Sequence, residues 1–178
     1  MLSIPEMRLS GSHEWSLPPS KSHLIRWLAV ISQSNSSCLI RFNKSPGEDV
    51  ESMSKCLQEM GINIHHKEDG WLVEPPKNGL SAPDTILNCG NSGTSARVLS
   101  ALVATMGEKI KLDGDESLRN RSSSLGKVLR DLQVDVDSDS LPVTVNGKNE
   151  RWHNRRFKPI KSAINCIDFG VPKSRGSD

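Results

Sequence analysis

Two segments of the chain, residues 53–64 and 125–136, carry the same order of apolar and polar positions at an offset of 72 residues. In each segment, apolar residues first recur with helical spacing and then alternate as in a short strand. Leu57 aligns with Leu129 in the helical part. Each segment therefore predicts an amphipathic helix that leads into a strand.

The same offset, 71 or 72 residues, relates three further pairs of segments. One pair is helix-like and two are strand-like: 24–29 with 95–100, 38–42 with 109–113, and 71–73 with 142–144. With a strand before each first helix, every repeat becomes a β-α-β-α-β-β unit. The pattern therefore predicts an α+β (α/β) fold in which about two such units are present.

Residues with special backbone preferences mark where the helices begin and end. Pro18 and Pro19 cannot lie inside a helix, and Ser20 directly after them is a good N-cap. Gly61 can end the second helix in a left-handed conformation. The segment 90–94 predicts a turn into the third helix, because it contains two glycines and an asparagine.

The charge distribution and the aromatic content argue against a nucleic-acid partner. The net charge is +2, but residues 151–178 hold seven Lys/Arg against two Asp, a net +5, which leaves −3 on the first 150 residues. Aromatic residues make up 4% of the chain and Tyr is absent, which argues against a base-stacking surface. We therefore expect no nucleic-acid partner.

The cysteines and the apolar stretches indicate the cellular setting. The four cysteines form no C-x-x-C pair and have no accompanying His cluster, so neither a metal site nor a disulfide framework is expected. The most apolar stretch, 24–31, is short and contains Arg26, so no membrane span is predicted. These features indicate a reduced, cytoplasmic protein.

The segment 20–26 could bind an anion at a helix start, where unpaired N–H groups and the helix dipole favour negative charge. Lys21 supplies a compact positive charge, and Arg26 offers a planar fork that suits a carboxylate or phosphate. Ser22 and Arg26 are four residues apart and share a helix face. Taken alone, the segment fits a capped helix with surface charges equally well.

Two other segments could also bind an anion. The residues Asn91, Gly93 and Thr94 stand at the second predicted helix start of this kind, and Arg97 follows them. Arg119 and Arg121 are predicted in the loop before the fourth helix, where they oppose the helix dipole unless an anionic ligand or an acidic side chain compensates. A plain glycine-rich turn and solvated arginines are the alternative interpretations.

Three motifs, 17–26, 89–97 and 113–121, resemble in order and spacing those of 5-enolpyruvylshikimate-3-phosphate synthase. The resemblance covers about residues 14–147. It divides the chain into an incomplete N-terminal domain of the enolpyruvyl transferase fold, 1–147, and a divergent basic tail, 148–178.

The resemblance implies transfer of the enolpyruvyl group of phosphoenolpyruvate to the 5-hydroxyl of shikimate 3-phosphate, in aromatic amino-acid synthesis. It implies a monomeric glyphosate target that needs no metal or organic cofactor, with two domains of three units each and acid–base carboxylates in the other domain. By motif, Lys21, Ser22 and Arg26 would hold shikimate 3-phosphate. Phosphoenolpyruvate would be held by Lys21, Asn91, Gly93, Thr94 and Arg121, of which Lys21 and Arg121 would stabilise charge during the reaction.

The chain departs from the family pattern in several places. Ser122 stands where the family has Pro. A third unit, the second domain and a Ser-Ser-Gln segment after Gly147 are not found, so we expect an N-terminal portion without turnover. From about Arg151 the pattern stops, and a one-base shift of the reading frame would permit the Ser-Ser-Gln segment.

Three other functions stay open at this point. UDP-N-acetylglucosamine enolpyruvyl transferase has Lys-Asn where this chain has Lys21-Ser22. A non-catalytic fragment that binds anions fits the length of the chain. A relative that processes RNA ends predicts salt-sensitive RNA binding, which the acidic first 150 residues disfavour.

Overall fold

The computed structural model describes residues 17–121, 124–147 and the strand 167–168. The first unit comprises α1 (Lys21–Ser32), β1 (Cys38–Arg41), α2 (Glu48–Glu59), β2 (Asn63–Lys67) and β3 (Gly70–Glu74). The second comprises β4 (Leu87–Asn88), α3 (Gly93–Val103), β5 (Lys109–Asp113), α4 (Glu116–Arg119), α5 (Leu125–Asp131), β6 (Asp135–Val136) and β7 (Val143–Asn146). A further short strand is β8 (Ile167–Asp168).

Each unit contributes the strands of one four-stranded sheet, and β8 completes the sheet of the first unit. The first sheet has the order β2-β3-β1-β8, with β1 antiparallel to β3 and parallel to β8. The second has the order β4-β5-β7-β6, with β5 antiparallel to β7 and parallel to β4. β8 therefore lies beside β1 as β4 lies beside β5. Residues 17–20, the described residues ahead of α1, contain no strand, so the strand predicted before the first helix is not seen there.

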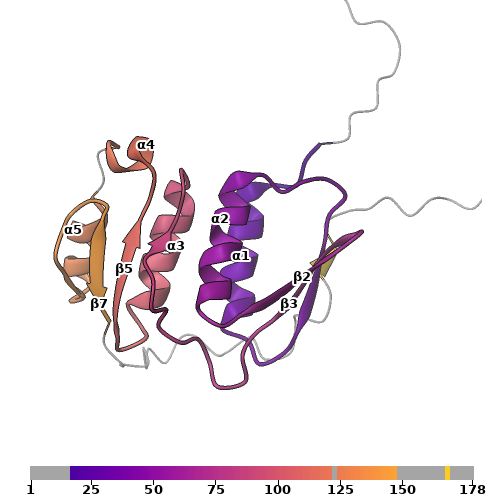
Figure 1. Ribbon diagram of the computed structural model, residues 1–178, viewed down its shortest axis with the longest axis horizontal. Coiled ribbons are helices and arrows are strands. Elements are labelled where there is room, and N and C mark those ends of the chain that lie inside the picture. Colours follow the sequence, from indigo (N-terminus) through magenta and orange to yellow (C-terminus); the bar gives the residue numbers. More distant parts are fainter. Residues whose placement is uncertain (1–16, 122–123, 148–166, 169–178) are drawn as a thin grey trace, which may run out of the picture.

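Helices α1, α2 and α3 pack against one another between the two sheets (Figure 1). On α1, Leu24, Leu28 and Ile31 lie three or four residues apart and are buried in this layer. Full burial of such a side chain contributes about 1.5–3 kcal/mol. The apolar stripe of each helix therefore faces the shared core and holds the two units together.

The predicted repeat is confirmed by equivalent elements in the two units. Segments 53–64 and 125–136 both run from a helix into a strand, and Leu57 and Leu129 are both buried. One predicted loop is partly wrong, because Arg119 ends the short helix α4. Asp115 caps that helix by accepting a hydrogen bond from the Leu118 backbone N–H at 2.7 Å. The side chain of Leu118 is buried, which fixes α4 in place.

The predicted helix ends are mostly confirmed. α1 begins directly after Ser20, although the Ser20 side chain makes no capping hydrogen bond. Gly61, at φ 99°, follows the end of α2 in the left-handed region. The turn at 90–94 leads into α3 as predicted, and Ser92 caps this helix by accepting a hydrogen bond from the Ser95 backbone N–H.

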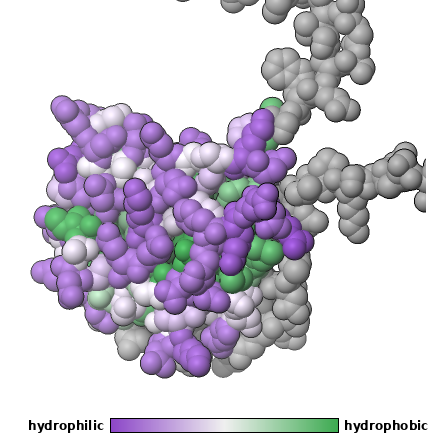
Figure 2. Space-filling view, turned by 45° about the vertical axis from the view of Figure 1, so that its right-hand side comes forward, coloured by the Kyte–Doolittle hydropathy of each residue, from purple (hydrophilic) through white to green (hydrophobic). Residues whose placement is uncertain are grey.

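Polar side chains dominate the face shown in Figure 2, where apolar side chains gather only in small patches. Two large apolar side chains, Val128 on α5 and Leu132 directly after it, are half exposed. In the part of the chain that the structure describes, no helix is long and apolar enough to cross a bilayer.

Candidate anion-binding site

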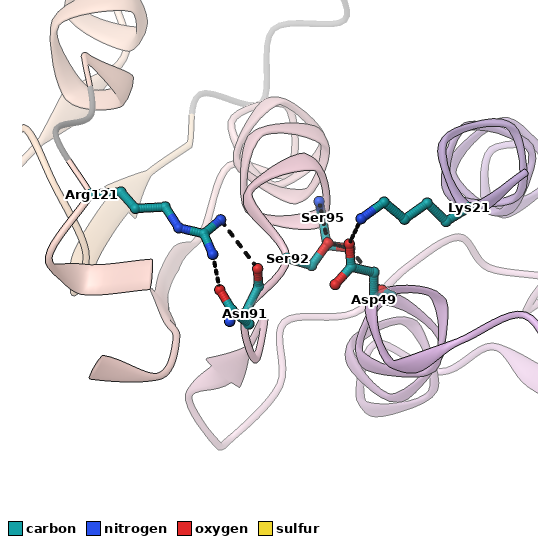
Figure 3. Close-up of polar contacts among 6 residues, drawn as sticks. All are labelled: Lys21, Asp49, Asn91, Ser92, Ser95 and Arg121. Carbon is teal, nitrogen blue, oxygen red and sulfur yellow. Dashed lines mark hydrogen bonds and ion pairs between the residues drawn. The ribbon is translucent and has the colours of Figure 1, made fainter. Parts of the chain in front are cut away.

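Arg121 follows α4 and points toward the turn before α3 (Figure 3). Its guanidinium donates to the Asn91 side-chain oxygen and, at 3.5 Å, to the Asn91 backbone oxygen. Both residues were predicted for the same ligand from separate motifs. The fold brings them together because α4 packs back over the start of α3 through Leu118, which is buried.

A pocket of about 80 Å³ opens beside this pair. Its walls come from α3, α4 and the start of α5, with Leu141 closing one side: Gly93, Ala96, Arg97, Leu118, Arg121, Leu125 and Leu141. A side chain added at Gly93 would place its Cβ 3.8 Å from Arg97 Nη1 and 4.0 Å from Arg121 Nη1. The space beside Gly93 is therefore bounded by two guanidinium groups and an apolar wall, an arrangement that suits a small anion with a carbon skeleton.

The start of α3 is fixed by its own serines. The Ser92 and Ser95 hydroxyl oxygens are 2.8 Å apart, and the Ser95 backbone N–H donates to Ser92 Oγ at 3.2 Å. Both serines are buried. Thr94, the second residue of the helix, is only half-buried. These hydrogen bonds hold the start of α3 in place where Gly93 adjoins the pocket.

Lys21 reaches the same region from the first unit. Its Nζ donates to Asp49 Oδ2 at 2.8 Å, and the Asp49 backbone oxygen accepts from Ser95 Oγ at 3.1 Å. Lys21 and Arg121 point toward the start of α3 from opposite sides (Figure 3). Asp49 thus connects the lysine of α1 to the helix that carries Gly93.

Ser22 and Arg26 contact each other, because Arg26 Nη1 donates to the Ser22 backbone oxygen at 2.8 Å. The guanidinium lies back along α1 in this structure. The role of Arg26 in binding a ligand stays a prediction.

Arg119 has a different place from Arg121 although it is two residues away. Its Nε donates to Asp113 Oδ1 at 2.8 Å, and its Nη2 donates to Asp113 Oδ2 at 2.5 Å. These hydrogen bonds hold the pKa of the Asp113 carboxyl below its ordinary value of 3.8. Asp113 is therefore the acidic partner that the sequence required for Arg119, while Arg121 remains directed toward the turn at Asn91.

Asp49 is a neighbour of Lys21 that no pattern in the sequence indicates. Glu48 and Asp49 stand in the first turn of α2, where acidic residues are common because they favour the helix dipole. The helix dipole is a sufficient local explanation for Asp49, so the sequence gives no sign of its ion pair with Lys21, which is 28 residues away in the chain. The apolar wall residues Leu125 and Leu141 also had no local signal that connected them to the pocket.

Within the described ranges, the cysteines and the other possible metal ligands form neither a disulfide nor a metal site. Cys38, Cys56 and Cys89 are buried and carry no disulfide there, and Cys166 lies outside these ranges. A hydrogen bond with Cys56, and then burial, raise the pKa of the Cys89 thiol far above its ordinary range. In the same ranges, no group of three His, Cys, Asp or Glu residues could hold a metal ion.

Comparison with known proteins points to one family. The family model for EPSP synthase (3-phosphoshikimate 1-carboxyvinyltransferase) matches residues 6–162. A curated 3-phosphoshikimate 1-carboxyvinyltransferase from Caldicellulosiruptor saccharolyticus is 32% identical over 136 residues, which cover 72% of this chain and 31% of the relative. Another from Pseudomonas sp. is 38% identical over 108 residues, 57% of this chain and 24% of the relative.

A solved structure of EPSP synthase from Acinetobacter baumannii is similar in fold, with a TM-score of 0.66 and 26% identity. The similarity covers 75% of this chain and 31% of that one. The chain spans 31% or less of the length of each of these proteins. The ordered motifs, the paired units and the family match agree: this chain belongs to the EPSP synthase (3-phosphoshikimate 1-carboxyvinyltransferase) family.

Proposed function

We propose that this chain binds the substrates of enolpyruvyl transfer from phosphoenolpyruvate to the 5-hydroxyl of shikimate 3-phosphate, a reaction that releases phosphate. The supporting observation is that Arg121 and Gly93 adjoin one pocket, while Asp49 joins Lys21 to the same helix start. The family to which the chain belongs carries the name of this reaction. Its proposed partners are these two small molecules, in a cytoplasmic monomer without cofactor or nucleic acid.

The pocket beside α3 is the proposed phosphoenolpyruvate end. Arg121 would bind a carboxylate or phosphate oxygen through its planar fork, and Asn91 holds that guanidinium in position. Gly93 would let the ligand approach the backbone at the helix start. Thr94 would shape the loop. The apolar wall at Leu118 suits the carbon skeleton of the enolpyruvyl group.

The start of α1 is the proposed shikimate 3-phosphate end. Lys21 lies between the two ends and would contact both substrates, because its side chain is 64% exposed while its ammonium is held near α3. Ser22 and Arg26 lie along the same helix, and Arg26 would turn from the Ser22 carbonyl to the substrate carboxylate. One hydrogen bond to a backbone oxygen is a weak restraint on a surface guanidinium.

Lys21 and Arg121 are the proposed catalytic residues. Enolpyruvyl transfer breaks the bond between the enol carbon and the phosphate oxygen, so negative charge develops on the departing phosphate. Fixed positive charges at both sides of that phosphate stabilise the transition state more than the ground state. No covalent intermediate on the enzyme is part of this proposal.

Titration calorimetry of the chain with phosphoenolpyruvate tests the proposal. Arg121→Ala should weaken binding by about 10-fold or more, because a charge-assisted hydrogen bond is worth about 1.5–3 kcal/mol. Arg41→Ala is the matched control, since it removes a half-exposed arginine of β1 that pairs with Asp69, in the turn between β2 and β3. Arg26→Ala should weaken shikimate 3-phosphate instead.

Two results would contradict the proposal. The chain could bind neither substrate, or Arg121→Ala and Arg41→Ala could lower the affinity equally, as for a general attraction of anions by the surface. Binding without turnover would agree with a substrate-binding portion of the enzyme.

A further inference from the structure

We infer that Asp49 is a positioning residue, which holds the Lys21 ammonium at the start of α3 so that it can meet the anionic substrate. The inference deepens the proposed function and rests on it. Its starting point is the 2.8 Å contact between Lys21 Nζ and Asp49 Oδ2, which joins α1 to α2.

Asp49 is itself held firmly. It is the second residue of α2, where the helix dipole favours a carboxylate. Its side chain is 23% exposed, against 64% for Lys21. Its backbone oxygen accepts the hydrogen bond from Ser95 Oγ at 3.1 Å. The carboxylate is therefore the fixed partner of the pair, and the lysine is the accessible one.

This arrangement determines where the ammonium lies. A lysine side chain has four rotatable bonds, and free rotation about them would spread the positive charge over a wide volume. Asp49 uses one of the three N–H donors and leaves two for a ligand. Ser95 also contacts Ser92 Oγ, next to Asn91, so the network that anchors Asp49 ends at the turn that receives Arg121.

The sign of the effect separates positioning from simple electrostatics. A carboxylate near an anion site repels the anion, so its removal alone should strengthen binding. If Asp49 positions Lys21, its removal should weaken binding, because the ammonium then leaves its place. Glu48 provides the matched control, since it stands beside Asp49 in the same turn and is exposed.

The first measurement is the affinity of the chain for phosphoenolpyruvate, with shikimate 3-phosphate as a second probe. Asp49→Asn should weaken binding about 10-fold, while Glu48→Gln should leave it equal or tighter. In a Lys21→Met background, Asp49→Asn should cause no further loss. Unchanged or tighter binding by Asp49→Asn would overturn the inference, even where Lys21→Met and Arg121→Ala confirm the proposed function.

The second measurement needs no ligand. Acetylation of Lys21 by acetic anhydride, followed by mass spectrometry, reports how firmly the ammonium is held. Asp49→Asn should speed the modification of Lys21 several-fold, and Glu48→Gln should not. Equal rates in the three proteins would overturn the inference whether or not substrate binds. Cooperative urea unfolding of each variant shows that the fold is retained.

Discussion

Gly93 is both the first residue of α3 and part of the pocket wall. It opens α3, directly after the capping Ser92, and its missing side chain leaves space beside the pocket. The space is not a packing defect, because an added Cβ would find its nearest neighbour, Leu118 Cδ1, at an ordinary 3.7 Å. The fold could accept a larger residue here, so the glycine is explained better by the ligand than by stability.

Replacing Gly93 with Ala should therefore weaken phosphoenolpyruvate binding while stability stays equal or rises slightly. The new methyl group would stand between the guanidiniums of Arg97 and Arg121, where the anion is proposed to lie. Alanine is favoured over glycine within helices by up to about 1 kcal/mol. Calorimetry of this variant measures the expected loss of affinity, and urea unfolding measures the expected equal or higher stability. Parallel losses of affinity and stability would refute this explanation.

At the scale of elements, α2 and α5 are equivalent helices in different surroundings. Met60 follows α2 and is fully buried, and the repeat aligns it with Leu132 after α5, which is half exposed. The difference arises because α2 also contacts α3 and β4 of the second unit. The same local sequence pattern thus produces two levels of burial, decided by the neighbouring unit.

The pair Met60→Ala and Leu132→Ala measures this difference. Met60→Ala should cost about 2–5 kcal/mol in the free energy of unfolding, because it leaves a cavity in a closed core. Leu132→Ala should cost less than about 1 kcal/mol, since much of its surface already faces solvent. Urea unfolding checks both, and equal losses would mean that the two helices are covered alike.

At the scale of the whole molecule, the proposed site is assembled from both units and stays open to solvent. Lys21 comes from α1 and Arg121 from the segment after α4, and both residues are exposed. At the site, Asp49 and Ser95 connect the two sides through hydrogen bonds. Catalytic charges in such an open groove are weakened by water, which a closing element would exclude.

The isolated chain should accordingly bind substrate but release no phosphate from phosphoenolpyruvate and shikimate 3-phosphate. A coupled phosphate assay at saturating concentrations of both substrates makes the test, with an intact enzyme of the family as positive control. Turnover that Lys21→Met abolishes would show that this chain carries complete catalytic machinery, and the expectation would then be wrong.

The repeat pattern was sufficient to predict most of the fold. The paired segments 53–64 and 125–136 predicted equivalent helix–strand pairs, and Gly61 predicted the end of α2. Such features are local, because apolar spacing and backbone preferences act within a few residues. The short helix α4 was missed, although its cap at Asp115 is local, because four residues are too few to show a helical apolar spacing. The burial of Leu118 is decided by tertiary packing.

The sequence by itself determined the repeated units, the helix starts and the family motifs, since each depends on residues close together in the chain. Only the tertiary structure decided which charges meet. It directed Arg121 to Asn91 across 30 positions and joined Lys21 to Asp49 across 28 positions. Contacts between distant residues follow from how the helices pack, and no local pattern records that packing.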